Sequence, residues 1–180
     1  MAAARNPAQI WRTVETPSIL LLMGVSGAGK TTVARELAKR LGWAFEEGDD
    51  LHPDANIRKM RAGIPLTDAD RQPWLAAVAA WIDRQRAAGL PGLITCSALK
   101  RAYRQIVVGE REGVRLIYLR GSRAFIAGKL GQRAGHFMPP GLLQSQLSTL
   151  EEPGAEENPL TVDIGPPAGE LAELIMKELG

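Results

Sequence analysis

A glycine-rich loop near the start of the chain constrains its fold more than any other feature. Residues 24–32 read GVSGAGKTT and come directly after Ile19–Met23, a run of apolar side chains. The spacing G-x-x-x-x-G-K-[ST] places consecutive backbone N–H groups around one concavity that binds phosphate oxygens. Glycine is needed there because phosphate approaches the main chain closely. The loop therefore predicts a strand, a phosphate-binding turn and a helix in succession, with a nucleoside triphosphate site at the turn.

Each residue type in this loop has a separate expected task. We expect Lys30 to reach the β- and γ-phosphates and the Thr31 hydroxyl to ligate Mg²⁺. Backbone N–H groups of the remaining positions would bind the other phosphate oxygens. The predicted nucleotide-binding residues are Gly24, Val25, Ser26, Gly27, Ala28, Gly29, Lys30, Thr31 and Thr32.

Short apolar runs alternate with helical patterns along the rest of the chain. This alternation is typical of βα units around a mostly parallel sheet, so the sequence predicts an α/β fold. A loosely ordered tail is expected at 1–17, followed by a single domain at 18–180. The expected strands are Ile19–Met23, 43–47, 92–96, 114–119 and 160–164, and the expected helices run from the loop to about 41, from about 68 to 88, and from 169 to 179.

Composition restricts the partners and the compartment. The formal net charge over 180 residues is only +2, which is unlike a nucleic-acid-binding arm or a polybasic membrane anchor. No apolar stretch approaches the roughly 18 residues that span a membrane. The lone Cys96 excludes a disulfide within the chain and fits a reducing compartment. We therefore expect a cytoplasmic protein whose partners include neither nucleic acid nor a membrane.

Acidic residues follow the second expected strand, where residues 46–52 read EEGDDLH. In an open α/β sheet, ligands bind beyond the carboxyl ends of the strands, so these carboxylates would face the phosphate that the loop holds. Asp49 is the candidate for the group that orients an acceptor hydroxyl and takes its proton. Glu47 would help to hold the metal ion. Asp50 adjoins Asp49, and the sequence leaves open which of these two acids faces the substrate.

Other polar residues lie in segments expected to form loops. His52 is either a hydrogen-bond partner of a polyhydroxyl substrate or a structural residue. Ser97 follows the third expected strand and is a candidate N-cap for the next helix. Residues 130–140 have the composition of a mobile flap, in which Arg133 would bring positive charge over the transferred phosphate.

Several short motifs together resemble the bacterial thermoresistant-type gluconokinases. A phosphate loop is shared by many families, whereas the HP dipeptide after GDDL, the DRQPW segment and CSALK are much more specific. The resemblance extends from about residue 20 to residue 164. The motifs that carry it are MGVSGAGKTT, GDDLHP, NIRKM, PLTDADRQPWL, CSALKRAYR, GHFMP, TLEEPGAEE and VDI.

This resemblance implies a P-loop kinase fold, in which helices flank a five-stranded parallel sheet. It implies a substrate-binding region at about 49–88 and a lid at about 130–140. The implied reaction is phosphorylation of D-gluconate by ATP, with Mg²⁺, to give 6-phosphogluconate. Members of the family commonly form homodimers, so a second copy of the chain is an expected partner.

By motif position, the resemblance also implies roles for individual residues. The implied catalytic residues are Lys30, Asp49 and Arg133, the implied substrate-binding residues are Asp49, His52, Lys59, Arg71, Lys100 and His136, and the implied metal-binding residues are Thr31 and Glu47.

Two other functions fit a phosphate loop in a chain of this size. One is phosphorylation of a different small hydroxy acid, such as shikimate. The other is a nucleotide-dependent switch with no small substrate. Against the switch, the sequence contains no N-K-x-D motif for reading guanine and no D-x-x-G segment after a strand.

Overall fold

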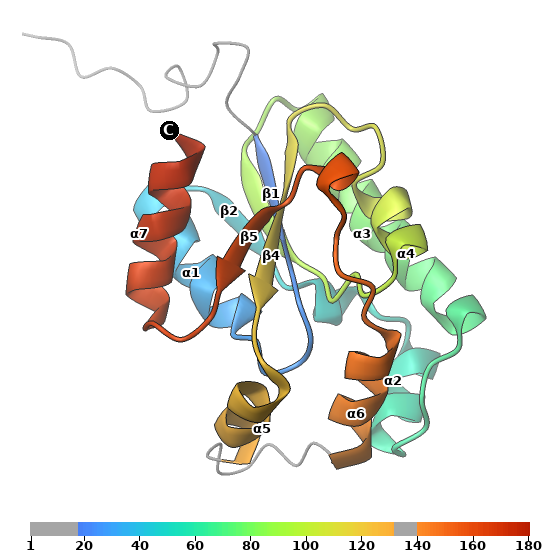
Figure 1. Cartoon of the computed structure of the whole chain (residues 1–180). Coiled ribbons are helices and arrows are strands. Elements are labelled where there is room, and N and C mark those ends of the chain that lie inside the picture. Colours follow the sequence, from blue (N-terminus) through green and yellow to red (C-terminus); the bar gives the residue numbers. More distant parts are fainter. Residues whose placement is uncertain (1–17, 132–139) are drawn as a thin grey trace, which may run out of the picture.

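Five parallel strands form the centre of the molecule (Figure 1). The computed structural model describes residues 18–131 and 140–180. In spatial order the strands are β2 (Ala44–Glu46), β3 (Gly92–Thr95), β1 (Ile19–Met23), β4 (Val114–Arg120) and β5 (Leu160–Asp163). The predicted α/β fold and its five strands are therefore confirmed, with strand ends that differ from expectation by one residue.

The strand β1 occupies the middle of the sheet, hydrogen-bonded to β3 on one side and to β4 on the other. Its side chains alternate between the two faces, as the period of a strand requires. Leu20 and Leu22 enter one hydrophobic core, and Leu21 and Met23 enter the other. The register pairs Ile19 with Gly92 and Val114, Ala44 with Gly92, and Ile117 with Leu160.

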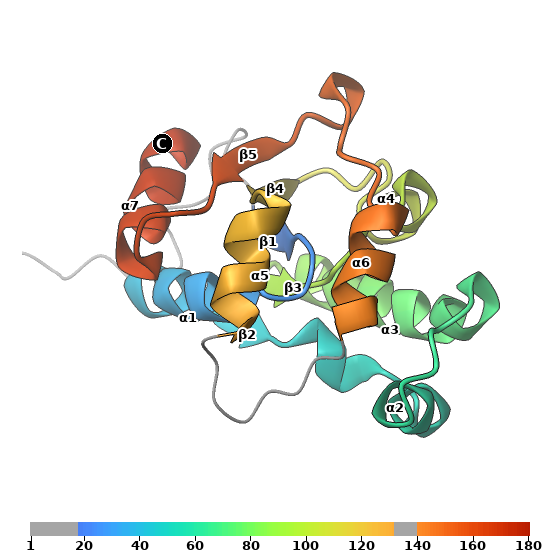
Figure 2. The same ribbon diagram turned by 60° about the horizontal axis from the view of Figure 1, so that its bottom comes forward.

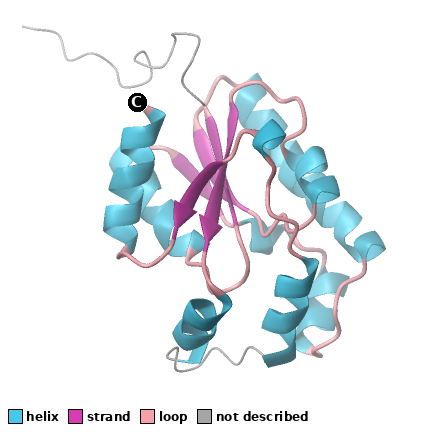
Figure 3. Cartoon of the chain, viewed as in Figure 1, coloured by secondary structure: helices cyan, strands magenta, loops and turns pink. Residues whose placement is uncertain are grey.

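Helices cover both faces of the sheet (Figure 3). On one face, α1 (Lys30–Leu41) packs against α7 (Ala168–Leu179), and on the other α3 (Asp68–Ala87) packs against α4 (Arg101–Val107). The apolar side predicted for α3 is buried, including Trp74 and Trp81, so these tryptophans belong to the core. Among the helices of the described ranges, none is long and apolar enough to cross a bilayer.

Further short helices gather at the carboxyl ends of the strands (Figure 2). They are η2 (Gly48–Leu51), α2 (Asp54–Arg61), α5 (Arg123–Gly131) and α6 (Pro140–Thr149), and a last turn, η3 (Ala155–Glu157), precedes β5. The expected tail at 1–17, and residues 132–139 of the expected lid, lie outside the described residues.

The prediction that Ser97 caps the helix after β3 is wrong. The helix α4 begins at Arg101, and Lys100 occupies its N-cap position. Residues 97–99 are instead irregular, with Ala98 at a φ of 46°. The buried Arg104 guanidinium donates to the Ala98 carbonyl oxygen at 3.1 Å and thereby holds this irregular segment in place.

Candidate active site

The phosphate loop connects β1 to α1 and depends on glycine at its start. Gly24 has a φ of +146°, and a Cβ there would lie 2.9 Å from the Leu119 carbonyl oxygen. No side chain fits so close a contact. The helix α1 begins at Lys30, directly after the loop. The first N–H groups of a helix have no partner within it and carry the positive end of its dipole, so this turn can hold phosphate.

The Lys30 side chain turns back over the loop. Its Nζ donates to the main-chain oxygens of Gly24 at 3.0 Å and of Val25 at 3.2 Å. Burial lowers the pKa of Lys30, and the negative charge of Asp49 opposes that shift. Burial raises the pKa of Asp49, and the positive charge of Lys30 opposes it. The ammonium and the carboxyl group therefore lie within each other's electric field at one edge of the sheet.

Lys30 and Asp49 line the same cavity, which has a volume of about 300 Å³. Asp49 is accessible from this cavity, yet enough protein surrounds it for loss of hydration to dominate its pKa. Other walls come from the phosphate loop, the segment between α2 and α3, the residues after β3, and α6. Among the described residues that line the cavity, Asp50 does not occur. The structure therefore favours Asp49 as the acid that meets a ligand.

Glu47 joins three elements through hydrogen bonds. The Thr31 hydroxyl, on α1, donates to Glu47 Oε2 at 2.6 Å, and the Thr95 hydroxyl, at the end of β3, donates to Glu47 Oε1. The Thr95 oxygen also accepts from the backbone N–H of Gly48 at 3.1 Å. A Cβ on Gly48 would lie 1.8 Å from the Thr95 carbonyl oxygen, so only glycine allows this approach.

The oxygen atoms of this cluster suit a hard cation. Hydroxyl and carboxylate oxygens are ligands that Mg²⁺ prefers, and it binds through one or two carboxylates together with phosphate and water. Within the described ranges, no group of three or more His, Cys, Asp or Glu side chains could hold a metal. Thr31 and Glu47 are therefore compatible with a magnesium ion that a nucleotide brings, rather than with a resident metal in a protein cage.

His52 lies between an indole and an amide. Its ring stacks on Trp74, with ring centroids 4.2 Å apart and planes 13° apart. Its Nδ1 lies 3.2 Å from the Asn56 amide nitrogen. Trp74 is itself held by a hydrogen bond from Nε1 to the Gly48 carbonyl oxygen at 2.7 Å. Burial, and secondarily the charge of Arg71, lower the pKa of His52 to about 4, so the ring is neutral at physiological pH.

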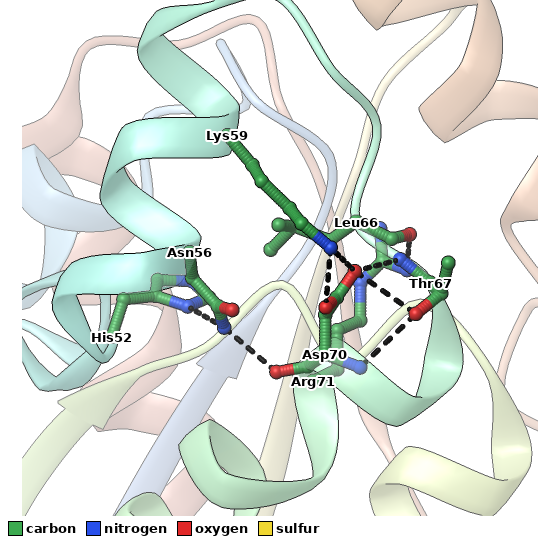
Figure 4. A network of polar contacts seen from close by, with 7 residues as sticks. All are labelled: His52, Asn56, Lys59, Leu66, Thr67, Asp70 and Arg71. Carbon is green, nitrogen blue, oxygen red and sulfur yellow. Dashed lines mark hydrogen bonds and ion pairs between the residues drawn. The ribbon is translucent and has the colours of Figure 1, made fainter.

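The three predicted substrate-binding cations, Lys59, Arg71 and Lys100, have different surroundings, and Figure 4 shows the first two. Lys59 Nζ lies 2.7 Å from Asp70 Oδ1, and Lys100 Nζ lies 2.8 Å from Asp68 Oδ2. Neither lysine is among the described residues that line the cavity, whereas Arg71 is. Arg71 Nη1 donates to the Leu66 carbonyl oxygen at 2.5 Å. Of these three cations, Arg71 is therefore the one at the cavity wall, and it has no carboxylate partner among the described ion pairs.

The helix α6 reaches the phosphate loop through Gln146. The side-chain oxygen of Gln146 accepts from the backbone N–H of Ser26 at 2.6 Å. That N–H belongs to the loop predicted to bind phosphate, so α6 contacts the phosphate loop directly.

Known proteins are similar in sequence to this chain over most of its length. A family model described as "AAA domain" matches residues 19–153. The protein named gluconokinase in Gluconobacter oxydans (strain 621H) is 54% identical over 141 residues, which cover 78% of this chain and 79% of that protein. This chain belongs to the gluconokinase family. The thermoresistant gluconokinase of Escherichia coli (strain K12) is 45% identical over 150 residues, covering 83% of this chain and 86% of that one.

A solved gluconokinase structure has the same architecture. The gluconokinase from Sinorhizobium meliloti 1021 is 43% identical, with a TM-score of 0.80, over 92% of this chain and 93% of that one. The P-loop kinase fold and the gluconokinase resemblance, both predicted from the short motifs, are therefore confirmed.

Sequence reasoning missed several residues of this candidate site. Thr95, Asn56 and Gln146 were not predicted, although each makes a hydrogen bond described above. Thr95 carries a usable signal, because it is a polar residue at the end of an otherwise apolar strand. Two predicted residues, Arg133 and His136, lie outside the described residues.

Proposed function

We propose that this chain is an ATP-dependent gluconokinase, which transfers the γ-phosphoryl group of ATP to D-gluconate and forms 6-phosphogluconate and ADP. One observation carries the proposal. Lys30 of the phosphate loop and Asp49 beyond β2 line the same cavity, in a chain 54% identical to a protein named gluconokinase. Phosphoryl transfer depends on such a pairing of a cation at the phosphates with a carboxylate at the acceptor.

In the proposed reaction, Lys30 leaves the carbonyl oxygens of Gly24 and Val25 and binds the β- and γ-phosphates. Its charge there stabilises the negative charge that the transferred group carries in the transition state. Asp49 accepts a hydrogen bond from the acceptor hydroxyl, orients its oxygen toward the γ-phosphorus and takes its proton. The raised pKa of Asp49 makes its carboxylate a stronger base than an ordinary aspartate.

Magnesium would be held by the Thr31 hydroxyl and, directly or through water, by Glu47. When bound, the ion supplies positive charge that neutralises the β- and γ-phosphate oxygens. The support for this assignment is the 2.6 Å contact between Thr31 Oγ1 and Glu47 Oε2, which places two hard oxygen ligands together at the start of α1.

For the sugar acid, we propose that Arg71 binds the carboxylate and that His52 contacts the same ligand. Both residues line the cavity. A guanidinium presents two parallel N–H groups that match a carboxylate, which makes Arg71 better suited than a lysine to this contact. A volume of about 300 Å³ is at the lower end for ligand sites, as expected for a six-carbon acid.

The discriminating experiment measures ADP release from ATP with a panel of hydroxy acids. We expect release with gluconate and none above the blank with shikimate. Release with shikimate instead would favour the other kinase interpretation, and ATP hydrolysis that ignores every acid would favour a nucleotide switch. We also propose a cytoplasmic location, because the reaction consumes ATP and the buried Cys96 is suited to remain a free thiol.

A further inference from the structure

Asn56 is a buried amide in the substrate-binding region, and its neighbours determine its orientation (Figure 4). It lies on α2 with 3% of its surface exposed. Its Nδ2 donates to the main-chain oxygen of Asp70 at 2.8 Å and lies 3.2 Å from His52 Nδ1. A carbonyl oxygen can only accept a hydrogen bond. The nitrogen of the Asn56 amide must therefore face Asp70, and it is this same nitrogen that faces His52.

This orientation determines where the proton of His52 lies. Because Asn56 presents an N–H group, His52 Nδ1 has to accept and carries no proton. The ring is neutral, since burial and Arg71 lower its pKa to about 4. A neutral imidazole that accepts at Nδ1 carries its proton on Nε2. Among the described residues, no hydrogen bond reaches Nε2, so this N–H remains available to a ligand in the cavity that His52 lines.

The stacking on Trp74 keeps the ring in this orientation. With ring centroids 4.2 Å apart and planes 13° from parallel, the indole supports one face of the imidazole along its whole width. A half-turn of the ring about its Cβ–Cγ bond would put a carbon atom next to Asn56 and lose the hydrogen bond to Nδ1. The position of the ring and the position of its proton are therefore determined by different neighbours, Trp74 and Asn56.

We propose that Asn56 is a positioning residue that holds His52 as the Nε2–H tautomer, so that His52 serves as a neutral hydrogen-bond donor to an acceptor oxygen of the sugar acid. The substrate part of this inference rests on the proposed function, whereas the tautomer does not. The opposite tautomer would present a lone pair to the cavity. It would repel a carboxylate or alkoxy oxygen instead of binding it.

The first test is nitrogen NMR on the unmodified protein at neutral pH. Long-range ¹H–¹⁵N correlation distinguishes a protonated from an unprotonated ring nitrogen. The chain has only two histidines, and the signal lost in His52→Gln identifies His52. We expect Nδ1 of His52 to be unprotonated and Nε2 to carry the proton, with the Nε2 signal shifting when gluconate is added. A proton on Nδ1, or an Nε2 signal that saturating gluconate leaves in place, overturns the inference.

The second test changes the amide to an acceptor of the same shape. Asn56→Asp presents carboxylate oxygens to His52 Nδ1, and this new negative charge raises the pKa of the ring. Tautomer and kinetics are therefore measured at alkaline pH, where the ring stays neutral and its proton should move to Nδ1. An unpaired buried acceptor then faces the substrate, and KM for gluconate should rise about tenfold or more, while KM for ATP changes by less than about twofold. Gln105→Glu makes the same amide-to-carboxylate change at an exposed position on α4 and should leave both constants unchanged.

The outcomes separate this inference from the proposed function. A tautomer switch in Asn56→Asp without a rise in the gluconate KM overturns the role of Asn56 in substrate binding. If the unmodified protein carries the Nε2 proton but phosphorylates no sugar acid, the proposed function falls and the tautomer assignment stands. The measurement on the unmodified protein decides the tautomer even if Asn56→Asp does not fold.

Discussion

The Thr31 hydroxyl donates to Glu47 Oε2 at 2.6 Å, which links the first turn of α1 to the residue after β2. The second oxygen of the same carboxylate accepts from Thr95 at the end of β3. A single side chain thus connects the phosphate loop to the two neighbouring strand ends. The elements that would surround a nucleotide's metal ion are therefore already linked to one another by hydrogen bonds.

Glu47→Gln should weaken the use of magnesium. The Thr31 and Thr95 hydroxyls donate to different oxygens of Glu47, and glutamine replaces one of these oxygens with an NH₂ group that cannot accept. We expect the half-saturating Mg²⁺ concentration for turnover to rise about tenfold or more, because ligands that orient a metal site have effects of that size. The adjacent Glu46→Gln is the matched control and should have little effect. An unchanged Mg²⁺ dependence in Glu47→Gln would remove Glu47 from the metal site.

Asp49→Asn and Asp50→Asn form a pair that decides which acid meets the substrate. Asp49 lines the cavity and lies in the field of Lys30. We expect Asp49→Asn to lower kcat by about 10²- to 10⁴-fold, the contribution typical of a positioned base. Binding of ATP, followed by calorimetry, should survive. Asp50→Asn should remain close to the unmodified protein, and the reverse result would transfer the role to Asp50.

The elements that the sequence predicted are those with an apolar pattern. The strands around β1 are short apolar runs, and α3 has a buried side at helical spacing. In both cases the residues that become buried are apolar and recur at the period of the element, so the sequence predicts them. The phosphate loop could be recognised for another reason. Close contacts, such as that between Gly24 and the Leu119 carbonyl oxygen, allow only glycine at certain positions, and the spacing of these glycines is visible in the sequence. Both signals are local, and both placed Lys30 and Asp49 at the same edge of the sheet.

The parts that escaped prediction depend on contacts between distant segments. Asn56 is the buried residue of α2, so this helix has no stripe of apolar residues by which the sequence could predict its buried side. The contact of Gln146 with Ser26 joins residues 120 positions apart. Whether Lys59 and Lys100 would be free for a substrate also depended on partners elsewhere in the chain, since each is paired with an aspartate of α3. None of these relationships appears in local spacing.

Arg71 should prove the most important of the three candidate cations for gluconate. Arg71→Leu removes the one that lines the cavity, and we expect KM for gluconate to rise about tenfold or more while KM for ATP stays within about twofold. Lys100→Met removes a cation already paired with Asp68, and a small effect is expected. Steady-state kinetics with both substrates varied would compare them. A larger effect from Lys100→Met would contradict the assignment.

Arg104 should be important for stability rather than for turnover. Its guanidinium is 2% exposed, pairs with both oxygens of Glu157 and donates to the Glu151 carbonyl oxygen at 2.8 Å. Arg104→Met leaves a mostly buried carboxylate without its partner, and such losses cost about 3–5 kcal/mol. Arg101→Met breaks only an exposed pair with Glu156 and should cost less than about 1 kcal/mol. Urea denaturation measures both, and equal costs would contradict this account.

His52 should titrate far below the usual range of a histidine. Burial and then the charge of Arg71 lower its pKa from 6.5 to about 4 in the folded protein. As pH falls, the unfolded chain therefore takes up this proton first. The neutral ring's contribution to the free energy of unfolding is complete above about pH 6.5 and is lost as pH falls toward about 4.

Two measurements check this titration. NMR should give a midpoint near pH 4 for the His52 ring, and Arg71→Leu should raise that midpoint because it removes a nearby positive charge. Urea denaturation should show that the difference in unfolding free energy between the unmodified protein and His52→Gln shrinks with acidification between pH 6.5 and 4. A midpoint near 6.5, together with a pH-independent difference, would mean that His52 is solvated rather than enclosed. In that case it could not serve as a donor held neutral beside an anionic substrate.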